Sequence, residues 1–417
     1  MAHMFFPKKS HKVRWVVFSL LGLGAVSLTP SFLDKAHGEG KAFVKDYANL
    51  ASFSYSQALR DLLDFQREMG PFLASPSSSS LDLLKQAFVK ARLSYGATEV
   101  FRFSEGPIDN SVDGPEGRMN AWPIDESYID YVESDPSSGI INTPSRYPQI
   151  TGELLTSLNE LGGEQNISTG FHAIEFLLWG QDRFADSAGN RDWKDFTTLS
   201  GARPNGIRRA EYLRVVTQLL VSDLSSITKA WDLSQPGSYG TSFVSLDPKV
   251  ALKKILDGSG TLAFGEMAGE RMFVSIDEQD QEHEHSCFSD LTHLDHEANL
   301  VGIQNVLTNT YSLPKFRPAH GEKWTIGWEK LHFNSGKGLI SLLEETQPSL
   351  AQKWKNSLIQ AEKTVGSIPA PFDVSLLEGS QGIQKIRESI ETLRTLGFVT
   401  QEAGSQWGVE VQLGVGD

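Results

Sequence analysis

Hydrophobic and polar positions follow a helical rather than a strand period along most of the chain. From Phe43 to Phe65, apolar side chains return every three or four residues, which is typical of an amphipathic helix, and Gly70-Pro71 is expected to end it. The same period predicts helices at 81–103 (with Ser80 as N-cap), 151–161, 208–231, 245–257, 258–276, 339–346, 350–365 and 383–396. Alternating strand patterns are scarce, so we predict an all-α protein made of helical bundles.

Two segments interrupt this pattern and divide the chain. Residues 104–150 are rich in Gly, Pro, Asp, Asn and Ser, and so long an irregular loop is uncommon unless it is functional or disordered. Residues 232–243 contain one proline and two glycines and form the best domain boundary. Because 417 residues exceed one ordinary core, we predict an N-terminal bundle at 39–235, which contains the loop, and a C-terminal bundle at 236–417.

The two predicted bundles share a short sequence similarity. Residues 94–103 and 263–273 each place aromatic, small, acidic and Arg positions at a helix end, before an acidic irregular stretch. Internal duplication would explain the match, and so would chance.

The N-terminus has the pattern of an export signal. Four basic residues between Lys8 and Arg14 precede an uncharged run at 15–33, and Ala36-His37-Gly38 offers small residues suited to cleavage. An uncleaved membrane anchor is the alternative, but the glycines and Pro30 in the run make it a poor spanning helix. We therefore expect a signal peptide at 1–38, no membrane span after cleavage, and a periplasmic or cell-surface location.

Composition narrows the classes of function. Hydrophobic residues make up 39% and charged residues 22% of the chain, as in a globular protein. The formal net charge of −14 argues against nucleic acid as a partner, because a nucleic-acid binder needs a basic surface. Cys287 is the only cysteine, which excludes an internal disulfide, and we expect it to be a small buried side chain.

The segment between Gly170 and Gly180 carries the strongest chemical signal. Every residue between the two glycines is apolar or aromatic except His172 and Glu175. A helix that is apolar on all sides is buried, and residues three apart share one face. The sequence therefore predicts an imidazole and a carboxylate side by side in the protein interior.

A buried carboxylate needs compensation, because leaving it unpaired costs on the order of several kcal/mol. A metal ion held by His172 and Glu175 is one solution. A His–Glu ion pair, or hydrogen bonds to neighbouring helices, is the other. Two ligands on one helical turn do not complete a metal site, and Glu99 and Asp125 are candidates for the remaining ligands. Arg102 either pairs with buried carboxylates or lies on the surface.

A second cluster of candidate residues runs from Asp277 to Glu297. It contains four of the chain's ten histidines, yet its spacing matches no closed zinc template. The alternative is a charged loop followed by a capped helix from about Asp290. Ser286, Asp290 and His293 are the more specific positions, since they lie at the junction of turn and helix.

These segments together resemble the imelysin-like family. Gly170-x-His172-x-x-Glu175 matches its Gly-x-His-x-x-Glu signature, and the likeness extends through residues 171–182. Residues 284–293 resemble the iron-regulated, insulin-cleaving-peptidase-like branch, and residues 106–109 and 122–125 also fit. The resemblance spans roughly residues 40–400.

The resemblance implies two helical bundles, export, and a part in bacterial iron acquisition, with a metal ion or iron-containing ligand and a membrane iron-uptake protein as partners. It implies a metal site with His172, Glu175, Glu99 and Asp125, and further binding residues Arg102, Ser286, Asp290 and His293 between the bundles. Carboxylates with an imidazole favour iron, and zinc or copper also suit them.

The family is classed with metallopeptidases, but neither His-Glu-x-x-His nor the inverted motif occurs in this chain. A metal-binding protein is thus our first hypothesis and a zinc-dependent peptidase the alternative, with no catalytic residue assigned. Haem binding through a histidine, or a structural surface module with a buried ion pair, is a third hypothesis.

Overall fold

A computed structural model describes residues 37–184, 187–278, 284–324, 326–328, 333, 336–377 and 379–414. The predicted signal peptide lies outside the described residues except for its last two positions, and so does His283. The described residues form helices and no strand, apart from one isolated bridge between Phe184 and Ser187. The predicted all-α class is therefore confirmed. Among the described helices, none combines the length and the hydrophobicity that a membrane span needs.

The N-terminal half contains the helices α2 (His37–Ala74), α3 (Ser78–Gly96), η1 (Glu99–Phe101), α4 (Glu116–Met119), α5 (Glu126–Ile129), α6 (Gly139–Asn142), α7 (Gly152–Leu158), α8 (Gly170–Trp179), η2 (Trp193–Phe196) and α9 (Gly206–Trp231). The C-terminal half contains α10 (Tyr239–Val244), α11 (Pro248–Thr261), η3 (Leu262–Phe273), α12 (Val274–Glu278), α13 (Thr292–Thr308), α14 (Leu339–Glu344), α15 (Pro348–Val365), η5 (Asp373–Leu376) and α16 (Gln381–Gln406).

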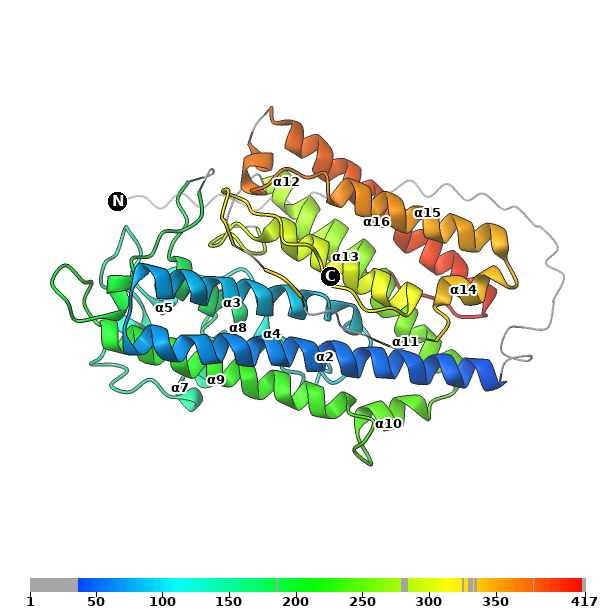
Figure 1. The fold of residues 1–417 in the computed structure, drawn as a ribbon, viewed down its shortest axis with the longest axis horizontal. Helices are drawn as coiled ribbons and strands as arrows, with labels where there is room; N and C mark the ends of the chain where they lie inside the picture. Colours follow the sequence, from blue (N-terminus) through cyan, green and yellow to red (C-terminus); the bar gives the residue numbers. More distant parts are fainter. Residues whose placement is uncertain are drawn as a thin grey trace, which may run out of the picture.

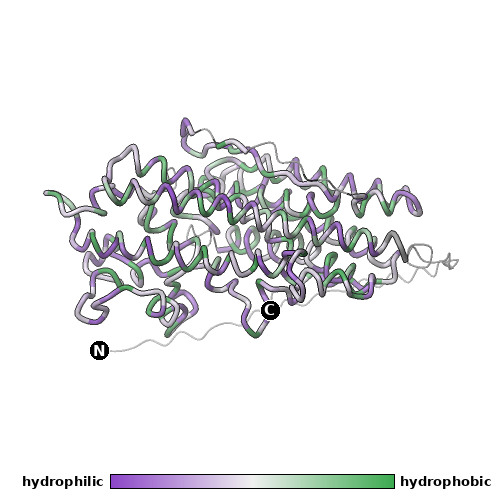
Figure 2. The backbone as a smooth tube through the Cα atoms, turned by 60° about the horizontal axis from the view of Figure 1, so that its bottom comes forward, coloured by the Kyte–Doolittle hydropathy of each residue, from purple (hydrophilic) through white to green (hydrophobic). Residues whose placement is uncertain are grey.

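The long helices run side by side in two groups (Figure 1). In the first group α2 packs along α3 and α9, and α8 packs against α3 and α9. In the second group α16 packs against α15, η3 and α11. Helix α13 contacts both groups, because it packs against α3 and η1 as well as α14 and α15. Polar and apolar segments alternate along the helices, as amphipathic helices require (Figure 2).

One hydrophobic cluster extends through both groups. The boundary expected near residue 235 falls between Trp231, where α9 ends, and Tyr239, where α10 begins. The division into two domains, and their origin by duplication, stay predictions.

Several helix ends differ from the predicted ones. Helix α2 continues through Gly70-Pro71 to Ala74, because a proline in the last turn costs few backbone hydrogen bonds and Phe72 is anchored in the core at 0% exposure. The N-cap of α3 is Ser77 rather than Ser80; the two serines form a reciprocal capping box.

The irregular segment 104–150 is packed rather than free. It contains the three short helices α4, α5 and α6, and it buries Ile108, Met119, Ile129 and Ile140 in the core. This packing brings the segment against α8 and α9.

The helical run at 248–278 contains a π-helical stretch, η3, in place of the α-helix expected there. A π-helix pairs residues five apart. Glu266 and Arg271 are five apart in this stretch, and Arg271 Nε donates to Glu266 Oε1 at 3.0 Å; the Arg271 side chain is buried.

Candidate functional site

Helix α8 carries the signature, and all ten of its residues are buried, as predicted. Gly170 has φ +87°, and a Cβ there would lie 2.6 Å from the Met119 carbonyl oxygen, so only glycine fits. Gly180, with φ +75°, ends the helix. Thr169 occupies the N-cap position, but its hydroxyl donates to the Arg118 carbonyl at 2.9 Å and so ties α8 to the irregular segment.

His172 and Glu175 form a hydrogen-bonded pair, with 3.0 Å between Nδ1 and Oε2. The other carboxylate oxygen of Glu175 accepts from the backbone N–H and the hydroxyl of Ser289, at 3.0 and 2.6 Å. Burial raises the pKa of Glu175 to about 8 and holds the pKa of His172 well below its ordinary value. At neutral pH the pair therefore carries one shared proton and little net charge, rather than two opposite charges.

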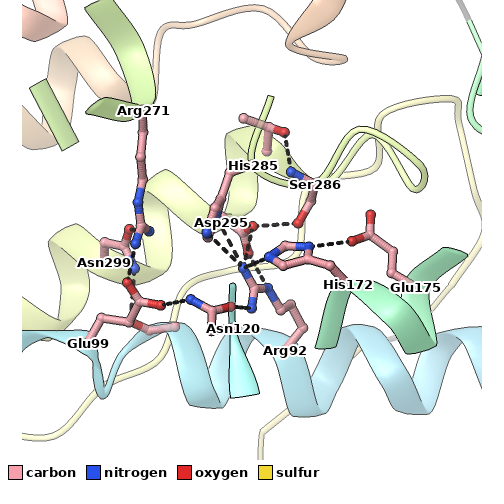
Figure 3. A network of polar contacts seen from close by, with 12 residues as sticks. Arg92, Glu99, Asn120, His172, Glu175, Arg271, His285, Ser286, Asp295 and Asn299 are labelled. Carbon is pink, nitrogen blue, oxygen red and sulfur yellow. Dashed lines mark hydrogen bonds and ion pairs between the residues drawn. The ribbon is translucent and has the colours of Figure 1, made fainter. Parts of the chain in front are cut away.

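The guanidinium of Arg92, from α3, lies at the centre of the surrounding network (Figure 3). Its Nη2 is 3.5 Å from His172 Nε2 and 3.1 Å from His285 Nδ1. Asp295, from α13, accepts from Nε and Nη2 of the same guanidinium at 3.0 and 3.1 Å. Two imidazoles and a carboxylate thus surround one cationic group in the interior.

Asp295 is the charged partner of this network. Besides Arg92 it meets the Ser286 hydroxyl at 2.6 Å and His285 Nδ1 at 2.9 Å. Burial alone would raise the pKa of Asp295, but Arg92 and His285 hold it well below the ordinary value. Burial lowers the pKa of His285 to about 3, so its imidazole is neutral.

Glu99 lies at the other end of the network. Asn120 contacts Arg92 with its carbonyl oxygen, and its amide nitrogen donates to Glu99 at 2.7 Å. Arg271 donates to the second oxygen of Glu99 at 2.5 Å. Burial opposes the ionisation of Glu99, but Arg271 and Arg102 keep its pKa below the ordinary value. Glu99 is therefore a carboxylate already neutralised by arginines.

Arg102 pairs with Glu116 at 3.1 Å and lines a cavity of about 380 Å³. Arg271, Trp122 and His285 line the same cavity. A small ligand in this cavity would meet the network at His285.

The hydrogen bonds of Asp125 do not connect it to this network. It is the N-cap of α5, where its carboxylate accepts from the backbone N–H and the hydroxyl of Ser127 at 2.9 and 2.6 Å. Within the described residues, neither Asp125 nor Glu99 joins His172 and Glu175 in a group of three close ligand atoms. The four-residue metal site stays a prediction.

Ser286, Asp290 and His293, the three candidates from the second cluster, have different surroundings in the structure. Ser286 belongs to the network through Asp295. His293 is held between the backbone carbonyls of Asp290 and Arg317, at 3.1 and 2.9 Å, and burial lowers its pKa to about 4.

Asp290 faces other carboxylates instead. One of its carboxylate oxygens lies within 4.8 Å of carboxylate oxygens of Asp182 and Asp373, and its Oδ2 pairs with His320 Nε2. Burial, followed by these two aspartates, raises the pKa of Asp290 to about 9. Cys287 is 2% exposed, as expected of a small buried side chain.

Six residues of this site were not singled out from the sequence: Arg92, Asn120, Arg271, His285, Ser289 and Asp295. The last three lie within the cluster at 277–297. Arg92 had a usable signal, since it follows Leu84 and Phe88 at four-residue intervals on the apolar face of its helix. A charge on such a face needs a buried partner. Nothing in the local pattern identifies Asp295 as that partner.

The fold and this network define an all-helical protein with a buried polar site on a Gly-x-His-x-x-Glu helix. The family model described as Imelysin matches residues 51–397, so the chain belongs to the imelysin family. No curated protein matches the chain.

Two solved structures share the fold. One, described as an iron-regulated protein A precursor from Parabacteroides distasonis, is 17% identical, covers 88% of this chain and 95% of its own, and has a TM-score of 0.65. The other, an imelysin-like protein from Psychrobacter arcticum 273-4, is 12% identical, covers 89% and 96%, and has a TM-score of 0.60. At these identities the likeness shows the fold alone.

Proposed function

We propose that this chain is an exported metal-binding protein that takes part in bacterial iron handling. The observation that carries the proposal is that two hydrogen-bonded pairs of ligand-type side chains lie next to each other in the interior: His172 with Glu175, and His285 with Asp295. Among the described residues, no three ligand atoms of these four side chains lie within 4.8 Å of one another, so a metal ion would have to draw the two pairs together. Two come from α8, one from the turn before α13 and one from α13 itself. The two imidazole rings are 5.0 Å apart.

The ligand chemistry supports a first-row transition metal. Imidazole nitrogens and carboxylate oxygens suit iron, zinc and copper. Both imidazoles have lowered pKa values, so their nitrogens need not lose a proton before they bind a metal. The iron-regulated description of one structural neighbour is consistent with iron as the metal.

Arg92 sets a condition on this function. Its guanidinium lies where a cation between the two imidazoles would lie, and two positive charges do not share that position. A bound metal therefore requires the Arg92 head group to move away. The neighbouring cavity beside His285 and Asn120 provides space on that side.

The test compares the full chain with the double variant His172→Ala/Glu175→Ala. Metal content is measured by elemental analysis and iron affinity by calorimetry. Glu175→Gln keeps the side-chain shape and serves as a milder variant. Glu402→Gln, an exposed carboxylate paired with Lys353, is the matched control. Stoichiometric metal that is lost in the signature variants alone, with helical circular dichroism intact, supports the proposal.

Absence of iron-group metal from the wild-type chain, or equal metal in the signature variants, refutes it. Peptidase activity is the alternative function, and a protease assay with the metal removed and restored separates the two.

A further inference from the structure

A group of acidic side chains beside the signature helix takes no part in the Arg92 network. Asp182 follows α8, Asp290 precedes α13, and Asp373 begins η5. One carboxylate oxygen of each lies within 4.8 Å of the other two. The three residues are 7%, 0% and 3% exposed, so the group is inside the protein.

The spacing of these oxygens suits one ion. Ca²⁺ binds oxygen ligands at about 2.3–2.6 Å, so ligands on opposite sides of it are about 5 Å apart. Three oxygens within 4.8 Å of one another can therefore touch the same cation without rearrangement of the helices that hold them.

Glu284 provides an independent indication of a ligand. Its side chain is completely buried, and among the described residues neither of its carboxylate oxygens has a partner with full hydrogen-bond geometry. Burial, followed by the nearby carboxylates of Asp373 and Asp290, raises the pKa of Glu284 well above its ordinary value, whereas the Thr292 hydroxyl lowers it. Glu284 therefore lies close enough to the group to be coupled to it. Buried carboxylates without hydrogen bonds are rare in folded proteins, and a bound ion is one of the standard explanations.

A route to the group exists from the surface. Asp182 and His320 line a cavity of about 730 Å³, and His320 contacts Asp290. An ion can therefore reach Asp182 and Asp290 from this cavity while the fold stays closed.

We propose that Asp182, Asp290 and Asp373 bind one hard divalent cation beside the buried carboxylate of Glu284, with Ca²⁺ the best match. Carboxylate oxygens suit hard cations, whereas the site at His172 offers imidazole nitrogens. Ca²⁺ is a better match than Mg²⁺ because Ca²⁺ accepts irregular sets of oxygen ligands, whereas Mg²⁺ requires a near-ideal octahedral arrangement. His320 contacts Asp290 and is not itself a ligand of the ion. This site goes beyond the proposed iron-handling function and uses none of its residues.

The experiment is calcium titration of the EDTA-treated full chain by calorimetry, with Mg²⁺ in a parallel arm, together with thermal denaturation with and without Ca²⁺. We expect one Ca²⁺ per chain and a higher melting temperature when it is bound. In Asp182→Asn/Asp373→Asn the affinity should fall by more than the roughly 10–100-fold that loss of an outer-shell partner causes, which is the effect expected of His320→Gln. Glu402→Gln should bind as the wild type does.

The variants also separate this site from the proposed iron site. His172→Ala/Glu175→Ala should keep its Ca²⁺, so a failure of the iron proposal leaves this one standing. Neutralising two of the carboxylates relieves repulsion, so the double Asn variant in EDTA should melt no lower than the wild type; if it does not fold, Asp182→Asn alone replaces it. No Ca²⁺ binding by the wild-type chain, or unchanged binding in the Asn variants, overturns the proposal.

Discussion

The buried pair of Arg92 and Asp295 allows the described network to be tested quantitatively. Both side chains are 1% exposed, and two guanidinium nitrogens lie 3.0 and 3.1 Å from the carboxylate. Asp295→Asn keeps the side-chain shape and removes the charge, so Arg92 remains cationic in the interior. Loss of one member of a buried ion pair costs about 3–5 kcal/mol. Because the ionised Glu99 also favours the charged form of Arg92, we expect the lower end, about 3 kcal/mol.

The assay is urea denaturation followed by far-ultraviolet circular dichroism at neutral pH. Arg92→Met/Asp295→Leu is the control, because replacing both charges with apolar groups often restores the stability that the single change removes. The double variant should therefore unfold at a higher urea concentration than Asp295→Asn. A loss below about 1 kcal/mol, the value of an exposed ion pair, or a double variant less stable than the single one, would refute the reasoning.

Two further predictions concern stability. Burial opposes the ionisation of Glu266, but Arg271, at 2.7 Å, lowers the pKa of Glu266 to about 2. The ionised Glu266 therefore stabilises the fold fully at pH values above 4.5, the pKa of the unfolded state, and this stabilisation is lost as the pH falls toward 2. The melting temperature of the wild type should therefore fall more steeply over this range than that of Glu266→Gln; parallel curves would contradict the assignment. In Gly302→Ala the new Cβ lies 2.6 Å from the Ala97 carbonyl oxygen, so we expect a loss of about 1–3 kcal/mol. In Gly70→Ala the new Cβ has no atom of another described segment within 4 Å, so we expect a gain of about 0.4–1 kcal/mol. Urea titrations in which both variants changed stability in the same direction would contradict this packing.

The periodicity of apolar residues was sufficient to predict the helices but not all of their ends. Helix α9 was expected at 208–231 and is found at 206–231, because a long amphipathic stripe and a Pro/Gly-containing linker define it. The continuation of α2 past Pro71 depends on the burial of Phe72, which is a tertiary effect. The π-helical pairing of Glu266 with Arg271 has no periodic signal, since the same residues also fit an α-helical pattern.

The site was predictable only where its chemistry is local. His172 and Glu175 were identified because their neighbours are all apolar, and the structure buries both. Their partner Ser289 is 114 residues from Glu175 in sequence, and Asp295 is 203 residues from Arg92. Such pairs leave no spacing pattern. The acidic group at Asp182 is equally invisible in sequence, because its members come from three separate segments.

The distance in sequence between Arg92 and Asp295 also has a consequence for biosynthesis. Helices α3 and α8 emerge from the ribosome before α13 exists. Until α13 arrives, Arg92 lacks its carboxylate and Glu175 lacks the donors of Ser289. The first half of the chain thus cannot complete its own interior, and a chain truncated before residue 289 keeps these groups unmatched. Only a nascent chain that extends through α13 satisfies both groups, so the interior of the first half can close only after α13 has been synthesised.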